Sequence, residues 1–118
     1  MAQQHEADNK MDYVEFPASD MGGTKAFYSN VFGWKFEDYG PGYAAFADGR
    51  IAGGFTSAAE AQGKGPLVVI YCDDLAAAAE RVRGRGGVII REIFSFPGGR
   101  RFHFRDPNGN ELAVWSAR

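Results

Sequence analysis

The sequence is short of the features that mark several large classes of protein. It has 118 residues but only one cysteine, Cys72, so no disulfide can form within the chain. No apolar run approaches the ~20 residues that a membrane-spanning helix needs. The net charge is -2, without the basic excess that nucleic-acid binding requires. We therefore expect neither a membrane nor a nucleic acid as a partner of this protein. The single cysteine fits a cytoplasmic location. We expect the partner to be a small-molecule ligand.

The first ten residues lack the apolar segment of a signal peptide. They are mostly polar, so we expect residues 1–10, which include His5, to form a flexible lead-in. Residues 11–118 are then expected to form a single domain, since the length is close to the usual size of one domain. Hydrophobic residues make up 45% of the chain, which is ordinary for a globular protein.

The first half, residues 11–57, predicts a strand, a helix and three more strands. Residues 13–17 read as a strand, and Asp20 can cap a helix that runs to about Phe32 and ends at Gly33. The Pro-Gly and Asp-Gly pairs that follow are turn signals, and they separate three short strand candidates at 34–39, 43–47 and 51–57.

The second half, residues 66–116, repeats this order after a polar linker at 58–65. An apolar strand at 67–72 leads to a helix capped by Asp73 or Asp74, with a helical apolar stripe that includes Leu75 and Val82. Strands follow at 88–94, 101–104 and 111–115. Each half alone could bury only one face of a thin sheet, so the repeat predicts an α+β fold in which two units share one core and enclose a groove.

Three segments give a more specific indication. Phe27-Tyr28, then 31–34 (Val-Phe-Gly-Trp), then 106–110 (Asp-Pro-Asn-Gly-Asn), resemble the vicinal oxygen chelate superfamily, which includes glyoxalase I, bleomycin-resistance proteins, fosfomycin-resistance enzymes and extradiol dioxygenases. The resemblance covers residues 11–116. It implies two βαβββ modules that form one cupped eight-stranded mixed sheet with the helices on its outer face, and commonly a homodimer.

The resemblance also implies one divalent metal, held by His, Gln or Glu on the first and last strands of each module. The matching positions here are Tyr13, Gly53, Leu67 and Ala113, none of which is a suitable ligand for a hard metal site. The sequence therefore predicts no metal and no other cofactor. A displaced metal site remains an alternative, because a two-residue shift along each strand keeps the face and introduces carboxylates. Its ligands would be Glu15, His103 and Glu111.

Strand alternation predicts which side chains line the cup. We assign Glu15 and His103 as candidate catalytic residues, since His103 is the histidine of the folded part and titrates near neutral pH. The candidate ligand-binding residues are Tyr13, Phe55, Tyr71, Glu111 and Trp115. Val14 and Phe16 are expected to pack on the helix side, and Cys72 is expected to be a buried, unreactive thiol.

Three functions remain open at this point. The first is metal-independent binding of a small aromatic or amphipathic molecule, as in the bleomycin-resistance branch, and the aromatic wall favours it. The second is a metal-dependent lyase or dioxygenase of the glyoxalase type that uses the displaced site. The third is a metal-free isomerase or lyase with Glu15 or His103 as general base and Tyr13 as hydrogen-bond donor. A fold alone does not choose among them.

Overall fold

The computed structural model describes residues 7–118, so His5 of the predicted lead-in lies outside the described residues. Eight strands form a mixed sheet and are accompanied by two α-helices, which confirms the predicted α+β class. The described chain divides into two compact units. The first unit contains residues 13–67, and the second contains residues 7–12 together with 68–118.

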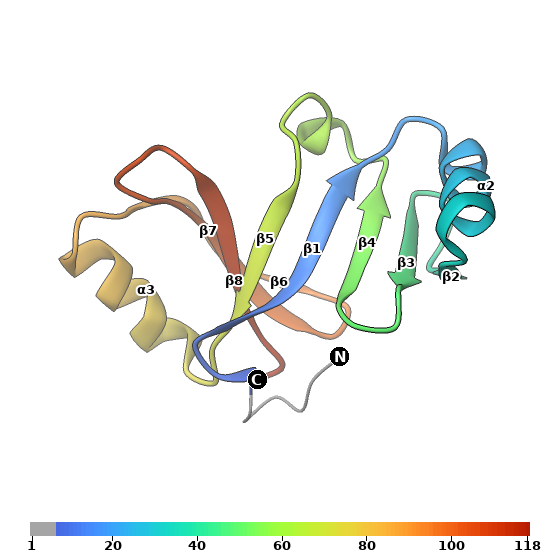
Figure 1. Cartoon of the computed structure of the whole chain (residues 1–118). Helices are drawn as coiled ribbons and strands as arrows, with labels where there is room; N and C mark the ends of the chain where they lie inside the picture. Colours follow the sequence, from blue (N-terminus) through green and yellow to red (C-terminus); the bar gives the residue numbers. More distant parts are fainter. Residues whose placement is uncertain (1–6) are drawn as a thin grey trace. The chain divides into compact units, whose positions relative to one another are not determined.

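The strands of the first unit lie in the order β2-β3-β4-β1 (Figure 1). Its first and last strands, β1 and β4, are parallel neighbours, whereas β2–β3 and β3–β4 are antiparallel pairs. A single 3-10 turn, η1 (Ala59–Ala61), follows the last strand. The bounds are β1 (Lys10–Pro17), α2 (Met21–Phe32), β2 (Lys35–Asp38), β3 (Tyr43–Ala47) and β4 (Ala52–Thr56).

Helix α2 begins and ends where the sequence predicts. The carboxylate of Asp20 accepts a hydrogen bond from the backbone N–H of Gly23 at 3.0 Å, as an N-cap does. Gly33 follows the helix with φ of 73°, a left-handed conformation that glycine adopts without steric cost. The local sequence therefore sets the length of this helix.

An aromatic cluster fills the space between α2 and the sheet of the first unit. Phe55 is 3% exposed, and its ring stacks on Phe16 at 5.4 Å and lies 5.2 Å from the ring of Tyr28 on α2. The expectation that Phe55 shares the face of Tyr13 and Glu15 is therefore wrong. Parallel pairing sets Phe55 against Phe16 and puts both on the helix side.

This placement predicts a structural rather than a ligand-binding role for Phe55. Phe55→Ala should lower the free energy of unfolding by about 3–5 kcal/mol, because it removes a buried ring and leaves a cavity. Urea unfolding followed by circular dichroism measures the change. Tyr39→Ala is the control, since Tyr39 is 60% exposed and should change stability by only about 0.5 kcal/mol. Equal effects of the two substitutions would contradict the placement.

The second unit repeats the topology of the first, with the strand order β5-β8-β7-β6 (Figure 1). Again the first and last strands, β5 and β8, are parallel neighbours, and the remaining pairs are antiparallel. The strands at 88–94 and 101–104 are longer than predicted, because they join directly into a hairpin. The bounds are β5 (Leu67–Tyr71), α3 (Leu75–Gly84), β6 (Val88–Phe96), β7 (Gly99–Arg105) and β8 (Glu111–Ser116).

Helix α3 packs on one face of the second unit's strands. Asp74, one of the two predicted caps, accepts a hydrogen bond from the N–H of Ala77 at 3.0 Å. The predicted apolar stripe of α3 packs against side chains such as Phe102 and Val114. Cys72 is 5% exposed in the same core, and burial raises the pKa of its thiol, so the thiol stays protonated near neutral pH.

Asp8 and Asn9, at the end of the predicted lead-in, form hydrogen bonds with the second unit. The backbone N–H of Asn9 donates to the carbonyl of Tyr71 at 2.7 Å, and the carboxylate of Asp8 accepts from the N–H of Asp73 at 2.9 Å. β1 then begins at Lys10, three residues earlier than the sequence indicates. Among residues 7–118, no helix is long and apolar enough to cross a membrane.

Candidate functional site

Two groups of polar side chains lie on strand faces that the helices do not cover, one group in each unit. In the first unit the hydroxyls of Tyr13 and Tyr43 lie 2.5 Å apart. The hydroxyl of Tyr43 also donates to Glu15 Oε2 at 2.9 Å. The structure therefore brings the predicted residues Tyr13 and Glu15 together through a third residue, Tyr43, which the sequence analysis does not single out.

Gly54 makes room for this group. It pairs with Glu15 across β1 and β4. A Cβ atom at Gly54 would approach the hydroxyl of Tyr43 to 2.3 Å and that of Tyr13 to 2.6 Å. The two rings therefore lie directly over the glycine backbone, a close approach that a strand glycine permits.

The hydroxyl of Tyr43 stays protonated. Burial raises the pKa of Tyr43 far above its ordinary value of 10, and the neighbouring carboxylate of Glu15 and hydroxyl of Tyr13 act in the same direction. Tyr43 therefore stays a hydrogen-bond donor throughout the physiological pH range. Glu15 accepts that hydrogen bond, so one of its two carboxylate oxygens already has a partner in the folded chain.

Removing the Tyr43 hydroxyl tests the first group. Tyr43→Phe should lower the free energy of unfolding by about 1–3 kcal/mol, because it takes away a donor from the half-buried carboxylate of Glu15. Urea unfolding at pH 7 measures the loss. Tyr39→Phe removes an exposed hydroxyl and should be neutral within about 0.5 kcal/mol. A neutral Tyr43→Phe would mean that the network does not form.

The second group is a histidine–glutamate pair on β7 and β8. Nδ1 of His103 lies 2.9 Å from Oε2 of Glu111. His103 stands directly opposite Ala113 in the β7–β8 ladder, and Glu111 precedes Ala113 by two residues, so all three side chains share one face. The flanking residues Phe102 and Phe104 point the other way, into the α3 core.

The pairing with Glu111 decides which nitrogen of His103 carries the proton. An ionised carboxylate can only accept a hydrogen bond, so Nδ1 must donate. In the neutral ring, Nε2 then carries a lone pair. Nε2 is buried, and the residues the structure describes supply no hydrogen-bond partner for it. Leaving a buried acceptor without a hydrogen bond lowers stability by about 1–3 kcal/mol. Such atoms are uncommon in folded proteins, and a ligand that donates a hydrogen bond would satisfy this one.

His103 is neutral near physiological pH. Burial is the main cause that lowers the pKa of its imidazole below the ordinary 6.5. The hydrogen bond to Glu111 opposes that shift, and the positive charges of Arg101 and Arg91 add to it. A neutral, oriented imidazole with a free lone pair can accept a hydrogen bond or a proton.

Aromatic rings and guanidinium groups surround the pair. The guanidinium carbon of Arg91 lies 3.7 Å from the centroid of the Phe94 ring. That ring in turn lies 5.8 Å from the ring of His103. The guanidinium of Arg101 lies 5.6 Å from the Phe94 ring and 5.9 Å from that of Phe96. The face therefore combines stacking surfaces with positive charge.

The two remaining predicted residues of this unit lie on the same face. Tyr71 is fully buried, and its ring meets Trp115 edge-on at 5.0 Å. The Tyr71 hydroxyl is a second buried polar atom without a hydrogen-bond partner among residues 7–118. Trp115 is 8% exposed, and its indole N–H donates to the buried carboxylate of Asp12 at 2.9 Å. Trp115 therefore has an anchoring bond that the sequence does not reveal.

The displaced metal site finds little support in these contacts. Glu15 belongs to the first unit and accepts from Tyr43, whereas His103 and Glu111 belong to the second and bind each other. In residues 7–118, no group of three or more His, Cys, Asp or Glu side chains is arranged to hold a metal ion. Hard divalent metals need about six donors, several from the protein. Tyr13, Leu67 and Ala113, at three of the positions predicted for the family's ligands, are not donors of this kind.

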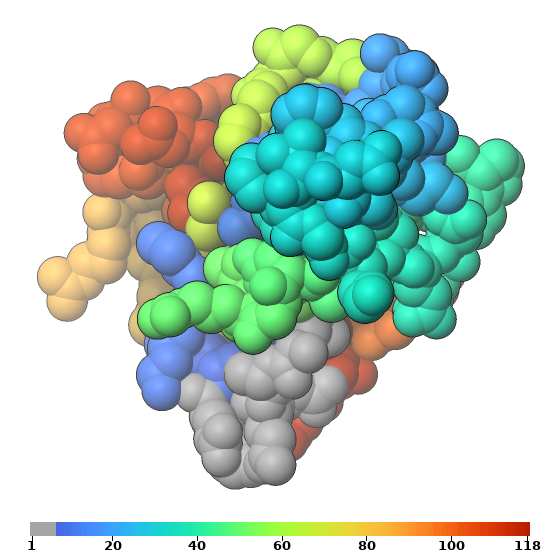
Figure 2. All heavy atoms as spheres, turned by 45° about the vertical axis from the view of Figure 1, so that its right-hand side comes forward, coloured from blue at the N-terminus to red at the C-terminus, as the bar shows by residue number. Residues whose placement is uncertain are grey.

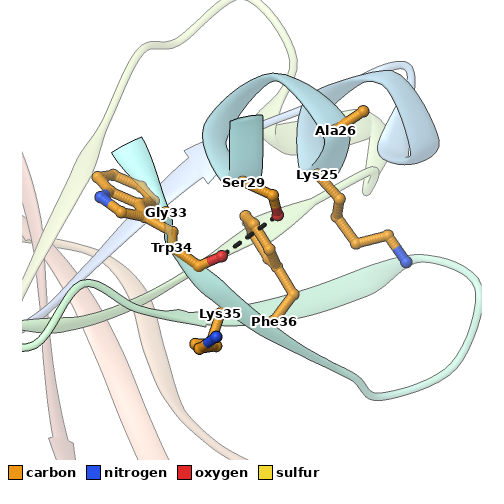
Figure 3. Close-up of a pocket in the computed structure, with 7 residues that line it drawn as sticks. All are labelled: Lys25, Ala26, Ser29, Gly33, Trp34, Lys35 and Phe36. Atoms are coloured by element: carbon orange, nitrogen blue, oxygen red, sulfur yellow. Dashed lines mark hydrogen bonds between the residues drawn. The ribbon is translucent and has the colours of Figure 1, made fainter. Parts of the chain in front are cut away.

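A hollow of the first unit lies away from both polar groups. Figure 3 shows this surface hollow of about 510 Å³ between α2 and β2. A hydrogen bond from the Ser29 hydroxyl to the Trp34 carbonyl at 3.2 Å joins two of its lining residues, and Lys25 is paired with Asp38 at 2.8 Å. None of the buried, unpartnered polar side-chain atoms of residues 7–118 belongs to its lining. Its lining residues are Lys25, Ala26, Ser29, Gly33, Trp34, Lys35 and Phe36.

Several residues in or next to the two groups are absent from the sequence-based site, and sequence signals point to two of them, Tyr43 and Arg91. A Gly-Gly pair inside a predicted strand marks a close approach, and this is where Tyr43 lies over Gly54. An arginine inside the mainly apolar strand predicted at 88–94 marks Arg91. Asp12 carries no such signal, because its partner Trp115 is distant in the chain. Phe94 carries none either, because its position depends on the irregular register of its strand.

Taken together, the two units define a duplicated α+β class in which the first and last strands of each unit are parallel neighbours. The chain belongs to the Glyoxalase/Bleomycin resistance protein/Dioxygenase superfamily, whose family model matches residues 10–114. This confirms the resemblance seen in the sequence.

Individual relatives agree with this membership. The chain is 27% identical over 117 residues to a putative glyoxylase, CFP32, of Mycobacterium tuberculosis, a match that covers 90% of this chain and 45% of that one. The chain therefore spans about half the length of that relative. It is 31% identical over 115 residues to a glyoxylase-like domain-containing protein of Didymella fabae, covering 86% of this chain and 88% of that one.

A solved structure supports the fold. The chain resembles the Mn(II)-bound glyoxalase of Novosphingobium aromaticivorans with a TM-score of 0.68 and 24% identity, over 94% of this chain and 40% of that one. At this identity the likeness concerns the fold alone.

The lowered pKa of His103 predicts a pH-dependent stability. Between the folded pKa and 6.5 the unfolded chain binds more protons at His103, so the free energy of unfolding rises with pH and levels off above about 7. The urea midpoint should therefore fall as the pH is lowered from 7.5 to 5.5. His103→Gln should flatten this slope, while the contributions of all other groups remain. Parallel slopes for the two proteins would show that His103 titrates normally.

Proposed function

We propose that the second unit binds a small aromatic or amphipathic molecule on the strand face opposite α3, and that binding needs no metal. The observation that carries the proposal is the buried, unpartnered Nε2 of His103 on a face lined by aromatic rings. Small-molecule sites combine an apolar wall with a few oriented polar groups. The hydroxyl of Tyr71 is a second polar atom of this kind on the same unit.

Metal independence rests on the chemistry of the side chains. Tyr13, Leu67 and Ala113, at three of the positions predicted for the family's ligands, carry no carboxylate or imidazole, and the fourth, Gly53, lies on the helix side with Phe55. The described carboxylates near the two groups already have hydrogen-bond partners. One fold relative is a Mn(II)-bound glyoxalase, so metal-dependent lyase or dioxygenase activity is the alternative that the experiment must separate.

A second candidate is a metal-free isomerase or lyase, and the His103–Glu111 geometry favours it. Glu111 holds Nδ1–H, which leaves Nε2 free to take a proton from a bound molecule. The resulting imidazolium would be stabilised by the carboxylate that orients it. His103 is the better candidate base of the two predicted, because Glu15 accepts a hydrogen bond from Tyr43.

A fragment screen on metal-free protein tests the proposal. Protein treated with a chelator and desalted should bind monocyclic and bicyclic aromatic fragments, and their binding should shift the NMR signals of His103, Ala113 and Tyr71. Adding Mn, Ni, Zn or Fe(II) should leave the affinities unchanged. Trp115→Phe should reduce the fluorescence quenching that the fragments cause, because Trp115 lies on this face.

Two outcomes would count against the proposal. Fragments that bind only after a metal is added would favour the metal-dependent alternative. Fragments that shift only signals from other parts of the chain would place the site elsewhere. Conversion of a bound carbonyl compound by metal-free protein, lost in His103→Gln, would support the isomerase or lyase.

The homodimer implied by the resemblance stays a prediction. Phe27, Val31 and Phe32 on α2 are 54–62% exposed, and the side chains of α2 lie at the surface in Figure 2. Apolar surface of this kind is often covered by a partner. Light scattering of the purified chain measures its mass in solution and decides the question.

A further inference from the structure

We propose that the molecule bound by the second unit is an aromatic hydroxy acid, whose carboxylate pairs with Arg91 and whose hydroxyl donates a hydrogen bond to Nε2 of His103. This inference rests on the proposed function, because it assumes that a small molecule occupies the face opposite α3. It adds the chemical class of that molecule and assigns a binding role to Arg91.

The backbone places Arg91 beside His103. The two residues are directly paired across β6 and β7, and the register of β6 is irregular on both sides of Arg91, between Ile89 and Arg91 and between Arg91 and Phe94. Irregular pairing of this kind re-aims side chains and is common next to functional sites. Here it brings Arg91 and Phe94, which are three residues apart, into contact with each other.

Phe94 holds the two polar groups at a distance that one small molecule can span. The Arg91 guanidinium lies 3.7 Å from the Phe94 ring centroid, and the His103 ring lies 5.8 Å from it. Stacking on Phe94 keeps the planar guanidinium oriented, so its N–H groups are preorganised for a carboxylate. An aromatic ligand with a polar group at each end can direct one group to the guanidinium and the other to the His103 ring.

The charges on this face favour an anion. Arg101 and Arg91 both act on His103 electrostatically, and the carboxylate facing them from β8, Glu111, is already bound to Nδ1 of His103. Arg91 is exposed and forms no ion pair within residues 7–118. By contrast, Arg83 of the same unit pairs with both Glu80 and Glu92 at 2.8 Å. A ligand carboxylate would supply Arg91 with the partner that Arg83 already has.

The state of His103 fixes the other end of the ligand. Because Nδ1–H is donated to Glu111, Nε2 of the neutral ring accepts and cannot donate. A carbonyl or ether oxygen would leave it unsatisfied, whereas a hydroxyl satisfies it. Glu111 acts here as a positioning residue, since it sets the tautomer without contacting the ligand.

Three probes separate the two contacts. The full chain is titrated at pH 7 with 4-hydroxybenzoate, benzoate and 4-hydroxybenzamide, followed by NMR of the backbone amides and the His103 ring nitrogens. We expect 4-hydroxybenzoate to bind about tenfold more tightly than either of the others, since benzoate lacks the hydroxyl and the benzamide lacks the charge. Its hydroxyl should shift the Nε2 resonance while Nδ1 stays protonated.

Matched variants assign the contacts to residues. Arg91→Gln should lower the affinity for 4-hydroxybenzoate about tenfold and leave the affinity for 4-hydroxybenzamide unchanged. Arg85→Gln, at the end of α3, removes the same charge away from the face and should change neither. Glu111→Ala should remove the preference for the Nδ1–H tautomer of His103, so that the Nε2–H tautomer becomes populated in the ring nitrogen spectrum. 4-hydroxybenzoate should then bind no more tightly than benzoate.

The outcomes distinguish this inference from the proposed function. If all three probes bind equally at the His103 face and Arg91→Gln has no effect, the assignment of an acid is wrong but a small-molecule site remains. If Arg91→Gln and Arg85→Gln weaken 4-hydroxybenzoate equally, the attraction is a general charge effect and Arg91 has no specific role. If no probe and no fragment shifts the His103 face, the proposed function itself is wrong.

Discussion

The hydrogen bond between Nδ1 of His103 and Glu111 is the interaction on which the chemistry of the second unit depends. It fixes the tautomer, holds the ring in place and leaves a buried lone pair on Nε2. Without Glu111, no described hydrogen bond would select which of the two ring nitrogens of His103 carries the proton. The bond exists because β8 lies next to β7 in a register that sets His103 opposite Ala113.

The two units use one topology for different purposes. In the first, the helix-free face holds a network in which Tyr43 joins the hydroxyl of Tyr13 to the carboxylate of Glu15 above Gly54. In the second, the equivalent face leaves polar atoms on His103 and Tyr71 without described partners. A satisfied network stabilises a unit, whereas unsatisfied buried atoms cost stability and are retained where a ligand supplies the missing bond. This contrast is why the proposed site lies in the second unit.

Membership of the superfamily leaves the reaction open, because this fold supports many chemistries. What separates them is the set of side chains on the strand faces. Here tyrosine, leucine and alanine stand at three of the positions predicted for metal ligands, and the second unit carries a histidine–glutamate pair and an arginine stacked on Phe94. The proposals therefore follow from these residues and not from the likeness to a metal-bound glyoxalase.

The sequence by itself determined the elements and their order. Asp20, Gly33 and Asp74 act within a few residues of their own positions, so their roles as helix boundaries were readable, and the repeat of one strand–helix–three-strand unit predicted the mixed sheet. Alternation along β7 and β8 also put Glu111, Ala113 and Trp115 on one face, because the side-chain period of a strand is two.

Only the tertiary structure decided which of these residues meet. Alternation within β4 did not reveal that Phe55 pairs with Phe16, since the register between two strands depends on packing across the whole unit. The approach of Tyr43 to Glu15, of Asp12 to Trp115 and of Arg91 to His103 joins residues from different strands, two of these pairs far apart in the chain. Such contacts depend on strand order, register and bulges, and these are properties of the folded chain rather than of any local segment.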